Sequence, residues 1–131
     1  MSAASARRPL TLAASLLAVL ALCGAGAATA GAGKAPKPKV VSVADFYFGP
    51  DAVTLKKGGA ILWKWAPTNS QPHDVHLKSG PKGLKKKGSY STTTTAVTNA
   101  QFKKSFETPG TYRFICTIHP TQMKMTVTVK K

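Results

Sequence analysis

The sequence predicts an all-β sandwich of about eight short strands. Short runs rich in Val, Ile, Thr and aromatic residues recur along residues 40–131, and Gly, Pro, Asp and Lys separate them. β-Branched and aromatic residues favour strands, whereas the separating residues favour turns. No run of ten residues in this region has the periodicity of an amphipathic helix. Short strands at this spacing are typical of a β-sandwich.

Four strands are predicted in the first half of this region, at residues 41–46, 52–56, 61–65 and 73–78. In the first, apolar Val alternates with small or polar residues. The second ends at the turn Lys57-Gly58-Gly59, and the third ends before Pro67, which cannot donate a hydrogen bond to a sheet. Trp63 and Trp65 lie two residues apart and share one face of the third strand, so we expect both in the core.

Four more strands are predicted in the second half, at residues 92–97, 102–107, 111–116 and 123–129. A loop over Ser79–Ser89, rich in Gly and Lys, precedes the first of them. The turn Thr108-Pro109-Gly110 separates the second from the third. The last run alternates strictly between apolar and polar residues, as a half-buried strand does.

Residues 1–30 have the pattern of a secretory signal peptide. Arg7-Arg8 precede an apolar run, Leu10–Leu22, and Ala28-Thr29-Ala30 matches a signal-peptidase site, so we expect cleavage after residue 30. The run is shorter than the ~18 residues that a membrane-spanning helix needs. Two alternatives stay open, namely a twin-arginine signal at Arg7-Arg8 and lipid attachment at Cys23. The sequence therefore predicts export, to a secreted, periplasmic or cell-surface location.

Beyond the leader we expect a flexible basic tether over residues 31–39 and one domain over residues 40–131. Removing the leader leaves Cys116 as the one cysteine, so no internal disulfide can form. An unpaired thiol is a liability in an oxidising compartment unless a metal holds it as thiolate. The alternative for Cys116 taken alone is a small buried apolar residue.

One group of residues has the composition of a metal site. Cys116, His119 and Met123 occur together in the segment CTIHPTQM, and His73 lies upstream in PHDV. One thiolate, two imidazoles and one thioether form the ligand set of a type 1 (blue) copper site, with a weak axial Met. A structural zinc site would normally need a fourth strong ligand, and no second cysteine remains. Met125 points to the same strand face as Met123, so either thioether fits the axial position.

Residues 40–131 resemble the cupredoxin family, the small blue-copper proteins of the plastocyanin, pseudoazurin and amicyanin type. The resemblance rests on three segments: DFYFGPDAVTLKKGG, ILWKWAPTNSQPHDV and ETPGTYRFICTIHPTQMKMTVTV. It implies a Greek-key β-sandwich, one type 1 copper ion, and Tyr112 as the tyrosine corner. It also implies that the axial ligand is Met123, because Met123 stands four residues before Val127-Thr128-Val129. His119 would be the electron port, in an apolar patch that includes Pro120.

The resemblance predicts an electron carrier and not an enzyme. Family enzymes need further His residues for a second type of copper, and beyond His73 and His119 this chain has only His76. His76 lies three residues after His73, which on a strand places it on the opposite face, as a surface residue. Photosynthetic members carry Tyr beside the Cys where this chain has Ile115, so a photosynthetic assignment is not supported.

Asp74 departs from the family pattern, which often has Asn directly after the first His ligand. A carboxylate can accept hydrogen bonds from backbone N–H groups but cannot donate an amide proton to the sulfur. We hypothesise that ionised Asp74 favours Cu(II) and lowers the reduction potential. The alternative is a solvated carboxylate at the end of a strand.

The chain is strongly basic, with 19 Lys and Arg against 4 Asp and Glu and a net charge of +15. Without Arg7 and Arg8, 17 basic residues remain against 4 acidic ones, a net charge of +13. The lysines gather in the Gly-rich loop and in the tether, at Lys78, Lys82, Lys85, Lys86, Lys87, Lys34, Lys37 and Lys39. Such a charge favours docking to an acidic redox protein, or to an anionic membrane or cell-wall surface. A solvated, self-repelling loop is the alternative.

We expect a monomer that does not bind nucleic acid, because the protein is exported and has no aromatic platform beside the lysines. The function predicted is single-electron transfer between redox partners by Cu(II)/Cu(I) cycling. Two alternatives stay open. One is a copper carrier or chaperone that delivers metal to an exported oxidase, and the other is a polycationic surface adhesion module.

Overall fold

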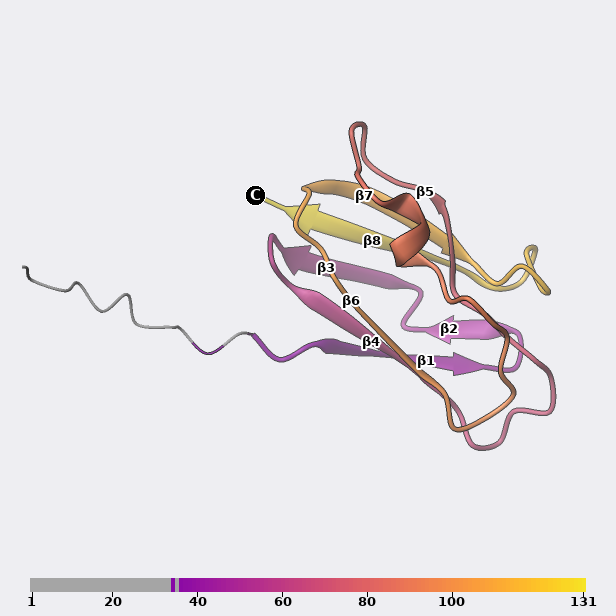
Figure 1. Ribbon diagram of the computed structural model, residues 1–131. Coiled ribbons are helices and arrows are strands. Elements are labelled where there is room, and N and C mark those ends of the chain that lie inside the picture. Colours follow the sequence, from indigo (N-terminus) through magenta and orange to yellow (C-terminus); the bar gives the residue numbers. More distant parts are fainter. Residues whose placement is uncertain (1–33, 35) are drawn as a thin grey trace, which may run out of the picture. The chain divides into compact units, whose positions relative to one another are not determined.

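A computed structural model describes Lys34 and residues 36–131, which form two four-stranded sheets packed face to face (Figure 1). The predicted leader, its cleavage site and Cys23 lie outside the described residues. The first sheet has the order β2-β1-β4-β6, with strands Tyr47–Gly49, Lys39–Ala44, Ala60–Trp65 and Gln101–Ser105. The second sheet has the order β3-β8-β7-β5, with strands Ala52–Lys56, Lys124–Lys130, Gly110–Ile115 and His76–Ser79. The eight-stranded all-β sandwich predicted from the sequence is confirmed.

The chain passes from one sheet to the other at every connection from β2 to β7, which brings distant segments together. β1 therefore pairs in parallel with β4, and β3 pairs in parallel with β8. The inward faces of the strands meet in one apolar core. Trp63 and Trp65 are both buried in it, as predicted.

The two ends of the sandwich are defined by β7, which begins at Gly110 and leads from Ile115 directly into Cys116. We call these the Gly110 end and the Cys116 end. Gly110 pairs with Val129 near the end of β8. The turn between β3 and β4 lies at the Gly110 end as well, since Gly58 N–H and Gly59 C=O bond to the backbone of Phe106, just after β6. The strands of both sheets therefore run between the same two ends.

Two strand predictions were wrong in detail. Residues 92–97 do not form a strand, and only Ala96 makes an isolated bridge, to His73. This segment crosses from one sheet to the other, so it cannot keep register with either despite its β-branched threonines. The first predicted strand, residues 41–46, is two residues too long, because β1 ends at Ala44 and the chain turns back into β2, a strand that was not predicted. Phe46 has φ 68°, in the left-handed region, at this turn.

The tyrosine corner is present at Tyr112 on β7. Its hydroxyl donates to the Thr108 carbonyl oxygen at 2.7 Å, and its ring is fully buried. This contact ties the β6–β7 turn to the core. The one helix of the described residues is the four-residue 3-10 helix η1 (Lys87–Tyr90), so none of the helices described here is long enough to cross a membrane.

Candidate metal centre

The loop between β7 and β8 holds two of the predicted ligands at its base. Cys116 directly follows β7, and Met123 directly precedes β8. Cys116 N–H donates to the Met123 carbonyl at 3.1 Å, and Met123 N–H donates to the His119 carbonyl at 2.9 Å. These two bonds close the loop on itself, and Cys116 and Met123 are completely buried. The buried thiol of Cys116 and the buried thioether of Met123 thus belong to residues that pair with each other across the base of the loop.

His73 reaches the same place from the connection between β4 and β5. Its backbone N–H and C=O both pair with Ala96 at 2.9 Å, and the indole N–H of Trp65 donates to its carbonyl at 3.2 Å. The ring is fully buried. The predicted strand over residues 73–78 is confirmed only from His76 onward, because residues 73–75 leave the regular ladder. His73 is held firmly although it lies outside a strand.

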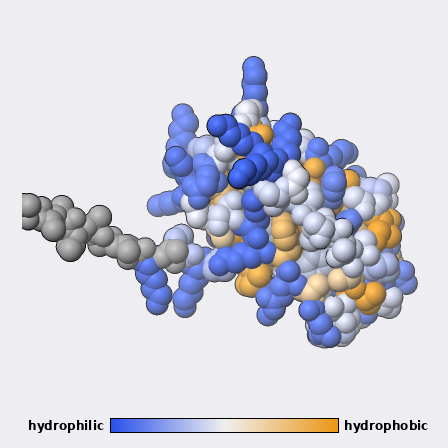
Figure 2. Space-filling model, in the orientation of Figure 1, coloured by the Kyte–Doolittle hydropathy of each residue, from blue (hydrophilic) through white to orange (hydrophobic). Residues whose placement is uncertain are grey.

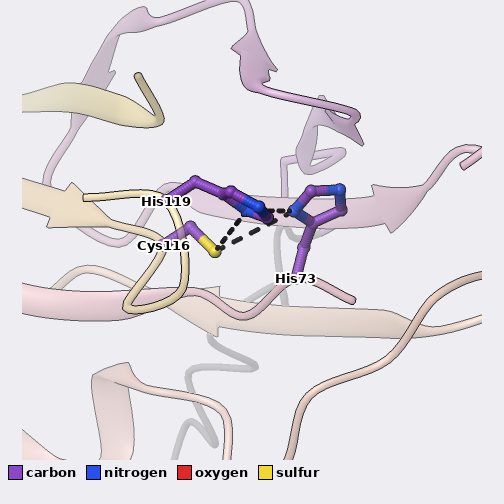
Figure 3. Close-up of side chains that lie close together, drawn as sticks. All are labelled: His73, Cys116 and His119. Carbon is purple, nitrogen blue, oxygen red and sulfur yellow. Dashed lines mark hydrogen bonds between the residues drawn. The ribbon is translucent and has the colours of Figure 1, made fainter. Parts of the chain in front are cut away.

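His73, Cys116 and His119 converge at the Cys116 end, with their ligand atoms facing one another (Figure 3). Cys116 Sγ lies 3.9 Å from His73 Nδ1 and 3.8 Å from His119 Nδ1, and the two Nδ1 atoms are 3.2 Å apart. A metal in a trigonal plane, at about 2.0 Å from each nitrogen and about 2.3 Å from the sulfur, needs S···N separations of about 3.7 Å and an N···N separation of about 3.5 Å. The triangle has the size that one copper ion requires.

The two methionines have different surroundings. Met125 lies within β8, and its sulfur accepts a hydrogen bond from the Trp63 indole N–H at 3.1 Å. Its thioether is therefore engaged in the core between the sheets. Met123 belongs instead to the loop that carries Cys116 and His119. This difference favours Met123 over Met125 as a ligand.

Asp45, in the turn after β1, contacts the site and was not predicted from the sequence to do so. Its Oδ1 lies 2.9 Å from His73 Nε2, on the side of the ring away from Cys116. A carboxylate can only accept, so the ring donates from Nε2 and leaves the Nδ1 lone pair facing the cluster. Ser70 and Gln71 donate further hydrogen bonds to the same carboxylate. The bond from His73, with those from Ser70 and Gln71, holds the pKa of Asp45 well below its usual range.

A hint of this role was present in the sequence, because Asp45 continues the alternation of two inward-facing valines. A carboxylate on a core-facing position needs a hydrogen-bonding partner. The sequence alone does not say that the partner is His73, which lies 28 residues away. Only the pairing of β1 with β4 brings the two together.

Asp74 connects the two ligand-bearing segments. Its Oδ1 accepts the Thr117 N–H at 2.7 Å, and its Oδ2 accepts from the Thr117 hydroxyl. Asp74 follows His73, and Thr117 follows Cys116. The Asp74 carboxylate therefore links the segment that carries His73 to the segment that carries Cys116. Asp74 is thus not merely a solvated carboxylate. Its backbone-accepting role agrees with the chemistry expected of an acid in this place.

His119 is the one member of the triangle that is not fully buried. The ring of Phe46 stands edge-on to the ring of His119, with centroids 5.0 Å apart. Phe46 and Ile118 are exposed by 49% and 41%, and Pro120 is also exposed, so His119 reaches the surface among apolar side chains. His76 is exposed on β5, as predicted, and takes no part in the cluster.

Comparison with known proteins agrees with the fold and the triangle. The sequence profile of copper-binding proteins of the plastocyanin/azurin family matches residues 38–130. Amicyanin-alpha of Methylorubrum extorquens is 36% identical over 117 residues, which cover 86% of this chain and 92% of that protein. Among solved structures, oxidised plastocyanin from Dryopteris crassirhizoma is 29% identical, covers 70% of this chain and 99% of its own, and superposes with a TM-score of 0.58.

A copper-containing nitrite reductase from Thermus scotoductus SA-01 also shares the fold, with a TM-score of 0.59 and 22% identity. The match covers 73% of this chain but only 23% of the reductase.

The chain belongs to the plastocyanin/azurin family of copper-binding proteins. The triangle of His73, Cys116 and His119 is accordingly a group suited to one copper ion, in a protein of the blue-copper, electron-transfer kind.

Proposed function

We propose that this protein is an exported electron carrier whose single copper ion is held by His73, Cys116, His119 and Met123. The observation that carries the proposal is the triangle of one sulfur and two Nδ1 atoms, whose sides match a trigonal copper plane. When bound, copper supplies one-electron chemistry between Cu(II) and Cu(I). The predicted leader and the buried, unpaired thiol of Cys116 support export.

The protein's part in this function is to keep the ligands fixed in both oxidation states. Trp65 and Ala96 hold the backbone of His73, and Asp45 orients its ring. Asp74, the residue after His73, accepts a hydrogen bond from Thr117, the residue after Cys116. Little reorganisation of the ligands is then needed when an electron arrives or leaves. Of the three histidines in the sequence, only His76 remains outside the set, so no residues are left for a second copper of the enzyme type.

Electrons would enter and leave through His119, because it is the cluster member that reaches the surface. Phe46, Ile118 and Pro120 surround it with exposed apolar area on which a redox partner can exclude water. A small contact surface is typical of brief, reversible electron-transfer encounters. The partner is therefore expected to be another redox protein with a matching apolar contact surface.

The proposal is tested by adding Cu(II) to the purified apoprotein. We expect one copper per chain, an intense absorption near ~600 nm from the Cys116 thiolate, and reversible bleaching by ascorbate. Cys116→Ser should abolish the absorption while leaving the fold intact by circular dichroism. A folded protein that binds cupric ion without colour would refute the proposal. Ready loss of copper to a moderate chelator would favour a delivery role instead.

The axial assignment is tested with a matched pair of variants. Met123→Leu should raise the reduction potential and alter the optical and paramagnetic resonance spectra, because the weak thioether bond to Cu(II) is lost. Met125→Leu should leave the spectra almost unchanged, since that sulfur accepts from Trp63. The opposite result would exchange the two roles.

A further inference from the structure

A group of seven lysines stands at the Gly110 end, away from the copper triangle. Lys56 pairs with Lys130 where β3 and β8 end, and Lys39 pairs with Ile61 where β1 and β4 begin. Pro81 packs against Gly110 and brings the Gly-rich loop to the same end. We define the distal lysine cluster as Lys39, Lys56, Lys57, Lys82, Lys85, Lys130 and Lys131. All seven are exposed.

These lysines lack acidic partners. Among the described residues, no Lys ammonium forms a salt bridge with a carboxylate, and the sole ion pair found there joins Asp45 to His73. Glu107 is the one acidic residue at the Gly110 end, beside Gly58. Among the described residues, seven exposed lysines therefore share this end with a single carboxylate.

The Cys116 end has a different surface. Asp45 and Asp74 lie against the copper triangle, and the Asp51 backbone bonds to Thr126 at the start of β8. Three of the four acidic residues are thus near this end. Figure 2 shows hydrophilic side chains projecting where the C-terminus lies, whereas apolar surface gathers toward the opposite end. The distal lysine cluster does not surround His119, so it is poorly placed to guide a partner onto that residue.

We propose that the distal lysine cluster is a docking surface for an anionic lipid bilayer, which leaves His119 facing away from the lipid. The proposal goes beyond electron transfer and does not depend on copper. A failure of lipid binding would leave the proposed function standing. An absent copper signal would likewise leave the lipid proposal untouched.

Three features favour a bilayer over other anionic partners. The lysines come from four separate chain segments and form a broad end, and they do not line either of the two pockets described, at Trp65 and at Phe114. Lysine is a flexible point charge that suits mobile headgroups better than fixed carboxylates. Val40, 54% exposed beside Lys39, adds an apolar contact.

The test compares two triple variants of equal charge, purified after expression of the full chain. The distal variant is Lys57→Gln, Lys82→Gln and Lys85→Gln. The control variant is Lys64→Gln, Lys78→Gln and Lys124→Gln, all exposed positions outside the distal lysine cluster. Binding is measured by co-sedimentation with phosphatidylcholine vesicles that contain about 30% phosphatidylglycerol, at salt from about 0.05 to 0.5 M.

We expect the distal variant to bind about 100-fold more weakly than the native protein, and the control variant to lose less than about fivefold. Binding of the native protein should weaken steeply with salt and vanish on pure phosphatidylcholine. Equal losses in the two variants would show a diffuse charge effect and overturn the proposal. Persistent binding to neutral vesicles would overturn it as well.

Orientation and partner class are tested separately. Acetylation of amines on vesicle-bound protein, read by mass spectrometry, should spare the distal lysine cluster and modify Lys64 and Lys124. The reverse pattern would contradict the proposed orientation. Polyglutamate serves as a mimic of an acidic protein. If it binds the distal lysines more tightly than vesicles of equal total charge, an acidic protein is the occupant and the bilayer proposal is wrong.

Discussion

Asp45 shows how one side chain outside the ligand set can govern a metal site. It fixes the tautomer of His73 and accepts hydrogen bonds from Ser70 and Gln71, which lie in the loop just before His73. Carboxylates that orient a ligating imidazole commonly raise metal affinity by 10- to 100-fold. Replacing Asp45 therefore disturbs both the ring and the loop that carries it.

We expect Asp45→Ala to weaken copper binding by roughly 10-fold or more, measured by competition with a chelator of known affinity. Asp51→Ala is the matched control, because Asp51 is exposed and the contact found for it is through its backbone oxygen. An unchanged affinity in Asp45→Ala would mean that the hydrogen bond to His73 is incidental.

Asp74 affects the copper site through charge as well as through its bridge to Thr117. A carboxylate near the metal favours Cu(II) over Cu(I), so Asp74→Asn should raise the reduction potential by roughly 50 mV. Asn keeps an oxygen that can accept the Thr117 N–H, so the bridge is largely preserved. Voltammetry of this variant beside Asp51→Asn separates a local effect from general loss of charge. An equal shift in both variants would argue against the local effect.

At the level of elements, the β6–β7 turn depends on Tyr112. Burial, with the neighbouring Tyr90, raises the pKa of Tyr112 to about 12, against about 10 for an exposed phenol. Between these values the unfolded chain releases the phenolic proton and the folded chain keeps it. The stabilising contribution is therefore complete below pH about 10 and is lost as the pH rises toward 12.

Tyr112→Phe should lower the free energy of unfolding by about 1 kcal/mol at neutral pH, through loss of the bond to Thr108. It should also flatten the decline of stability between pH about 10 and 12 relative to the native protein. Denaturant titrations at several pH values test both effects, with Tyr47→Phe as the control because Tyr47 is 56% exposed. A decline as steep as that of the native protein would assign the effect to other groups.

Regular elements were predicted well because they follow from local alternation. Residues 52–56 match β3 as observed, and Cys116 stands at the end of β7 as the motif required. The bridge segment around Ala96 and the turn at Phe46 were missed, since their conformations depend on crossing between sheets and on a left-handed residue. Asp45 was missed for the same reason, as its partner comes from a different strand connection.

On the scale of the whole molecule, the high net positive charge destabilises the folded state. The described lysines have no acidic partners, so like charges repel across the surface. We expect the melting temperature to rise by a few degrees as NaCl increases from about 0.01 to 0.5 M, measured by calorimetry. The distal triple variant should depend on salt less than the native protein does. A melting temperature that falls with added NaCl would contradict this account.

The separation of the distal lysines from the three acidic residues near Cys116 has one more consequence. We expect such a separation to give the protein an electric dipole moment along its strands, in addition to its net charge. Near a negatively charged surface, the electric field of that surface exerts a torque on the molecule before contact is made. The protein would therefore approach a negatively charged surface with the Gly110 end first and the Cys116 end, which holds the metal site, facing away.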